Sequence, residues 1–105
     1  VGIRLRFSSL PIYEEGLDLI DRGVSTGVTE SNRAMTGEQI RLASGLTDAQ
    51  KGLLFDPQTS GGLLISTPAA RAVALVAALH KRGVEAAAIV GEVFTAAAPV
   101  LEVVP

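Results

Sequence analysis

The sequence predicts an α/β (α+β) domain with a mixed four-stranded sheet and helices packed mainly on one face. Two observations lead to this prediction: four short runs of residues have strand character, and two longer runs repeat their apolar side chains with the helical period. Apolar residues make up 48% of the 105 residues, so the chain is long and apolar enough for one domain with one core.

The four strand-like runs cover residues 3–7, 63–65, 84–94 and 100–104. The first alternates apolar and polar side chains, which is typical of a half-buried strand. Residues 63–65 are entirely apolar and predict a central strand. Because a helical run and then residues 84–94 follow them, we expect a right-handed βαβ unit.

The two helical runs cover residues 13–22 and 69–82. Gly23 and Gly83 follow them directly, and glycine at that position commonly ends a helix. A shorter helix is predicted after Thr47, whose spacing from Gln50 matches a capping box.

Two further segments are assigned from local chemistry. Thr67 and Pro68 resemble an N-cap and the first residue of the helix that follows. Residues 24–35 are rich in turn-forming side chains and show no clear period, so we predict a loop there.

Composition excludes several functional classes. The net charge is −2 and the arginines are scattered, which argues against nucleic-acid binding. No apolar run approaches the roughly 18 residues of a membrane span. The sequence has no cysteine and shows no secretory signal, so we expect a cytoplasmic protein with no membrane partner.

The residues that usually carry catalysis are sparse. His80 is the one histidine, and its position between an apolar helix and Lys81 predicts a solvated helix end. Neither a P-loop nor a G-x-G-x-x-G motif occurs. We therefore assign no catalytic residue and no metal ligand to this chain.

The strongest candidate site is the turn-rich stretch before residues 63–65. Its glycines permit a close backbone approach, and successive N–H groups with two hydroxyls could bind an anion. The competing interpretation is a structural loop in which an aspartate caps a turn and the glycines take positive φ. The candidate residues are Asp56, Gln58, Thr59, Ser60, Gly61 and Gly62.

This stretch closely resembles a known signature. FDPQTSGGLLIS, residues 55–66, is similar to the C-terminal signature of the selenophosphate synthetases. The flanking segments agree: residues 10–19 resemble the family's "LP…GALEL" helix, residues 27–32 its "GGTxxN" loop, and residues 90–93 its "IGEV" strand. Val28 departs from the pattern, since it stands where the family has a second glycine.

The resemblance implies that residues 1–105 form the C-terminal domain of a longer enzyme that makes selenophosphate from selenide, ATP and water. It also implies a fold like that of the C-terminal domain of aminoimidazole ribonucleotide synthetase. The partners would be the enzyme's own N-terminal ATP-binding domain, which this domain covers, and a second copy in a homodimer. ATP and Mg²⁺ would belong to the full-length protein, with no cofactor in the isolated chain.

The family's catalytic Cys or selenocysteine, its lysine and its metal-binding aspartates belong to the part that is absent here. Among matched positions, Asn32 joins the Asp56 to Gly62 loop as a candidate for lining the cleft between domains. Two alternatives stay open: the corresponding domain of a related ATP-dependent synthetase, and a free-standing ligand-binding module. The upstream reading frame would distinguish all three.

Overall fold

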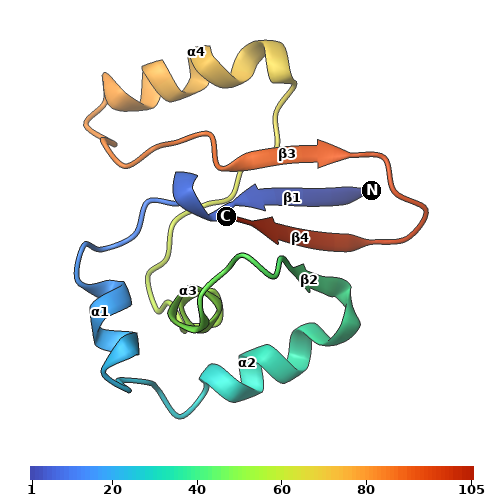
Figure 1. The fold of residues 1–105 in the computed structure, drawn as a ribbon. Coiled ribbons are helices and arrows are strands. Elements are labelled where there is room, and N and C mark those ends of the chain that lie inside the picture. The colour runs from blue at the N-terminus through green and yellow to red at the C-terminus, as the bar shows by residue number, and fades with distance from the viewer.

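The protein folds around a mixed sheet of four strands in the order β2-β4-β1-β3, seen in a computed structural model that describes residues 1–105 (Figure 1). β4 pairs in parallel with β1 and β2, and β1 pairs antiparallel with β3. The predicted mixed four-stranded sheet is thereby confirmed. The strands are β1 (Gly2–Arg6), β2 (Ile40–Leu42), β3 (Gly91–Phe94) and β4 (Val100–Val104), and the helices are α1 (Gly16–Asp21), α2 (Thr29–Thr36), α3 (Asp48–Leu53) and α4 (Ala69–His80), with short 3₁₀ turns η1 (Phe7–Ser9) and η2 (Gly37–Gln39).

The core forms on one face of the central pair β1–β4. Five residue pairs join these strands in register, from Gly2 opposite Val100 to Arg6 opposite Val104. Because side chains alternate along a strand, one face of this pair is apolar. Val103, only 1% exposed, packs there with Phe7 and Leu46.

α1 and α3 cover this apolar face. Leu17 of α1 and Leu53 of α3 pack against the core cluster, which confirms that helices lie mainly on one side of the sheet. α4 is placed differently: it lies beyond β3, set apart from the sheet, and none of its residues is buried (Figure 1).

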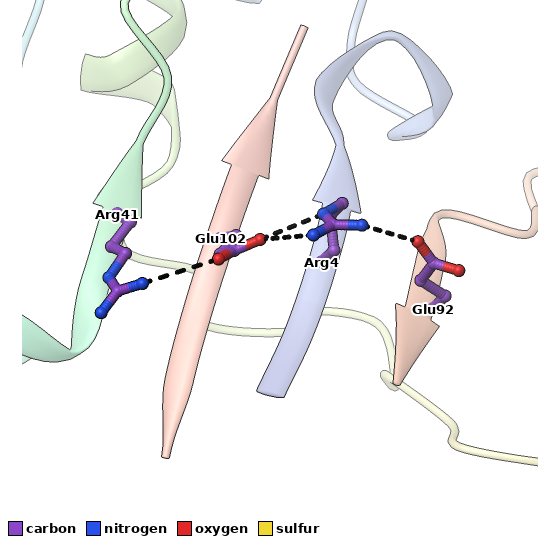
Figure 2. A network of polar contacts seen from close by, with 4 residues as sticks. All are labelled: Arg4, Arg41, Glu92 and Glu102. Carbon is purple, nitrogen blue, oxygen red and sulfur yellow. Dashed lines mark hydrogen bonds and ion pairs between the residues drawn. The ribbon is translucent and has the colours of Figure 1, made fainter. Parts of the chain in front are cut away.

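The opposite face carries a network of charges that crosses all four strands (Figure 2). Arg4 donates through Nε and Nη2 to one carboxylate oxygen of Glu102, at 3.1 and 2.9 Å, and through Nη1 to Glu92 at 3.1 Å. Arg41 lies 3.8 Å from the other oxygen of Glu102. The hydrogen bonds and charge of Glu102, and then those of Glu92, raise the pKa of Arg4. These contacts hold the strands in register on the face that no helix covers.

Several predicted helix ends are confirmed. Gly23 and Gly83 have φ of 82° and 84°. In each case the N–H of the next residue reaches back to a carbonyl five residues earlier, as in a Schellman motif. Thr47 and Gln50 form the expected capping box at the start of α3. Thr67 is not a cap, because α4 begins after Pro68 without a side-chain hydrogen bond.

The prediction that residues 63–65 form a central strand is wrong. Leu63, Leu64 and Ile65 lie outside the sheet and are 89%, 64% and 53% exposed. The fourth strand is instead β2, which pairs with β4 through residues 40–42. An apolar run indicates that a segment tends to be covered, but it does not specify which strand will pair with it.

Two neighbouring predictions also need correction. Residues 24–35 are not all loop, since α2 begins at Thr29. Its apolar side chains are few, so periodicity gave no sign of it. Only Gly91–Phe94 of the predicted strand 84–94 pairs with the sheet, and it runs antiparallel to β1. With residues 63–65 outside the sheet, the expected βαβ unit does not form.

Gly91 is expected to be intolerant of any side chain. An added Cβ would lie 1.9 Å from the carbonyl oxygen of Arg4, inside the β1–β3 pair. We predict that Gly91→Ala lowers the free energy of unfolding by about 1–3 kcal/mol, as overpacking does. Gly27→Ala, where nothing lies within 4 Å, is the matched control and should stay within about 0.5 kcal/mol. Urea unfolding compares the two, and equal losses would contradict the prediction.

Candidate functional site

The structure brings two of the predicted site residues together at α2. The side-chain amide of Asn32 donates to the backbone carbonyl of Phe55 at 2.9 Å, so α2 is tied to the residue just before Asp56. On the same helix, the guanidinium carbon of Arg33 lies 5.1 Å from the centre of the Phe55 ring, a cation–π contact. These two contacts hold the start of the candidate loop against α2.

Two shallow hollows meet at Asp56. Residues 29, 30 and 33 of α2 line the first, and residues 32, 35 and 36 line the second. Asp56 lines both, and the end of α1 completes the first. This part of the molecule combines Asn32 and Asp56 with polar side chains of residues 24–35, for which the sequence predicts a loop.

Arg33 is a candidate site residue that was not predicted from the sequence. It lines the first hollow together with Glu30 and Asp56, although neither carboxylate lies within ion-pair distance of it. A guanidinium can bind a phosphate or carboxylate group, but the two carboxylates that share this hollow leave it without a net positive charge. In the sequence, Arg33 was one of several scattered arginines. Its position next to Asn32 was the one available signal.

The rest of the candidate loop extends away from α2. Gln58 folds back, and its amide donates to the Asp56 carboxylate at 3.0 Å. Thr59, Ser60, Gly61 and Gly62 are exposed, and the two hydroxyls make no hydrogen bond within the protein. The structure thus groups Asn32, Asp56 and Gln58, and leaves the hydroxyl and glycine part of the loop open to solvent.

The backbone contradicts the structural interpretation of the two glycines. Positive φ occurs at glycines 23, 37 and 83 alone, so neither Gly61 nor Gly62 adopts it. The anion-binding interpretation stays a prediction, because successive N–H groups can also form a nest in a turn, and Thr59 and Ser60 lie in one. The structural alternative also fails in detail, since the Asp56 carboxylate bonds Gln58 and caps no turn.

Two other polar features lie outside this region. His80 bonds through Nε2 to the carbonyl of Ala87 at 2.8 Å, which ties the end of α4 to the next segment. Acidic and histidine side chains do not gather in groups of three or more that could hold a metal ion. Every helix is too short or too polar to cross a membrane.

No protein-family model matches the chain. Individual proteins do match it. The chain is 42% identical over 92 residues to the selenide, water dikinase of Pelobacter propionicus. The aligned residues make up 88% of this chain and 26% of that protein. The chain is 37% identical over 100 residues to the enzyme of the same name from Rhizobium meliloti, covering 95% and 29%. A third, from Pseudomonas straminea, is 48% identical over 66 residues, covering 63% and 18%.

The chain belongs to the selenide, water dikinase family. These matches include nearly the whole chain, which agrees with the resemblance carried by residues 55–66. The chain spans only 18–29% of the length of the family members it matches. The dikinases therefore contain this segment together with a much longer stretch of polypeptide.

The bond between Asn32 and Phe55 is expected to fix the candidate loop on α2. In Asn32→Asp, a carboxylate would face the Phe55 carbonyl in place of the amide donor. We predict a loss of about 1–3 kcal/mol of unfolding free energy at pH 7. The loss should shrink below about pH 4, where the new carboxyl takes up a proton and can donate again.

Ala34→Asp is the control, since it adds the same charge to an exposed neighbour on α2 whose side chain makes no hydrogen bond. Chemical unfolding from pH 3 to pH 7 measures both variants. An equal, pH-independent loss in the two would show that the Asn32 bond contributes nothing specific.

Proposed function

We propose that this chain is the C-terminal domain of a selenophosphate synthetase, whose full-length form makes selenophosphate from selenide, ATP and water and releases AMP and phosphate. The observation that carries the proposal is the match of up to 95% of this chain to a segment of the selenide, water dikinases. The signature at residues 55–66 supports it independently of overall identity. That the fold is like the C-terminal domain of aminoimidazole ribonucleotide synthetase stays a prediction.

In this proposal the domain packs over an N-terminal domain that binds ATP and Mg²⁺, in a cytoplasmic homodimer. The exposed hydroxyls of Thr59 and Ser60 support a role in that cleft, because they are free to donate to phosphate oxygens. Near the start of the same loop, Arg33 supplies a positive charge with no ion-pair partner, in a hollow that Glu30 and Asp56 also line. Bound Mg²⁺ would neutralise phosphate charge, and its ligands would come from the rest of the protein.

The related-synthetase alternative has less support, because the relatives described above are all named selenide, water dikinases. No observation favours the free-standing module. A reading frame that continues upstream into a segment with a Cys or selenocysteine and a lysine would support the selenophosphate synthetase proposal alone.

The proposal predicts a difference in activity between the complete protein and this chain. With selenide and Mg-ATP, the full-length product should release AMP, whereas residues 1–105 alone should release none, because no candidate nucleophile or metal site lies in them. AMP is followed by chromatography. If the full-length protein releases no AMP under these conditions, the proposed function is wrong. If residues 1–105 alone release AMP, the proposal that the catalytic residues lie in the rest of the protein is wrong.

The exposed hydroxyls should matter for turnover and not for folding. In the full-length enzyme, Thr59→Ala with Ser60→Ala should lower kcat at least about tenfold, since one lost donor to a developing charge can cost more than that. The melting temperature should hardly change, because both side chains are exposed and unbonded. Ser8→Ala with Thr95→Ala, also exposed, is the matched control. Full activity in the first pair would return the loop to a structural role.

A further inference from the structure

Residues 62–67, in the segment between α3 and α4, leave their backbone unpaired. These six residues make no backbone–backbone hydrogen bond, and none of their N–H or carbonyl groups bonds a side chain. Within this segment Leu63, Leu64 and Ile65 are all more than half exposed. Free backbone groups beside exposed apolar side chains are the features of a strand that lacks its partner.

The charges of the molecule set this segment apart from the sheet's own edges. β2 and β3 are the two edge strands, and they carry the exposed charges Arg41 and Glu92. Charged side chains at an edge discourage pairing with another strand. Residues 57–70 contain no Asp, Glu, Lys, Arg or His. The sheet edges are thus protected against further pairing, and this segment is not.

We propose that residues 62–67 dock as an added β-strand on an exposed sheet edge in the remainder of the longer polypeptide. In an added strand, Leu63 and Ile65 would face one side and Leu64 the other. The edge that receives them must therefore offer backbone N–H and carbonyl groups flanked by apolar side chains. This inference rests on the proposed function, since it requires that the chain is part of the longer enzyme.

The length of the relatives selects this occupant over a second copy of the chain. Each matched relative carries this segment within a protein of which it forms 18–29%. An edge in the same polypeptide is present at a high effective concentration, of the order of millimolar for a flexible connection. A second copy would have to reach comparable concentrations to compete.

Hydrogen exchange in the full-length protein and in residues 1–105, both without substrates, tests the proposal. The amides of residues 62–67 should exchange freely in the short chain and slow by at least about tenfold in the full-length protein, as buried ladder hydrogen bonds do. Leu63→Asn with Leu64→Asn should restore fast exchange there in the full-length protein. Val73→Asn with Val84→Asn, which alters two exposed apolar residues elsewhere, should leave the protection unchanged.

Equal exchange in the two proteins would overturn the proposal. Slow exchange of residues 62–67 in the short chain would also overturn it. If that protection does not depend on protein concentration, the strand pairs within the domain. If it increases with concentration, the strand pairs with a second copy of the chain. Because the measurement uses neither selenide nor ATP, its result is separate from the activity assay. A full-length enzyme that makes AMP but leaves residues 62–67 unprotected would retain the function and reject the docking strand.

Discussion

The parallel pairing of β1 with β4 is the interaction on which the rest of this fold depends. It joins residues 2–6 to residues 100–104, so the two ends of the chain form the centre of the sheet. β3 pairs with β1 on one side, and β2 pairs with β4 on the other. Val103, the most buried side chain, lies in this pair and contacts Phe7 and Leu46. Closing so long a loop is entropically costly, and the apolar burial under β1 and β4 offsets that cost.

The two faces of this central pair stabilise it in different ways. One face is apolar and covered by α1 and α3, so its contribution comes from burial. The other stays partly open and relies on Arg4, which binds acidic side chains on both neighbouring strands. Arg4 also stacks over Phe94, 5.0 Å from the ring centre, which occupies the arginine fully. The two arginines and two glutamates of this network therefore balance in charge, whereas Arg33 has no ion-pair partner.

The candidate site follows from how the chain leaves this sheet. α2 and the start of the loop at Asp56 are joined by the contacts of Asn32 and Arg33 with Phe55. Beyond Gln58, the chain runs through exposed hydroxyls, glycines and apolar residues before α4 begins. A domain that stood alone would gain little from such a stretch. A domain that covers a larger partner would bury it, which is why the proposed function and the docking strand concern the same part of the chain.

Features set by a few neighbouring residues could be predicted from the sequence alone. The ends of α1 and α4 at Gly23 and Gly83, and the capping box of α3, were predicted because caps and left-handed glycines act within one helical turn. β1 and β4 were also predicted, since their apolar residues face a core whatever their partners. The family followed from residues 55–66, a signature that depends on residue identity and not on conformation.

Pairing and placement were decided by the tertiary structure. β2 has three residues, too few for a pattern, and it is a strand because β4 offers it an edge. α2 forms where its few apolar residues give no period, and its contacts with Phe55 come from a residue more than twenty positions away. Residues 63–65 show the reverse case, because their apolar character was plain and yet no strand of this domain pairs with them. A β-strand forms only when a second segment pairs with it, and the local sequence of one segment does not specify that partner.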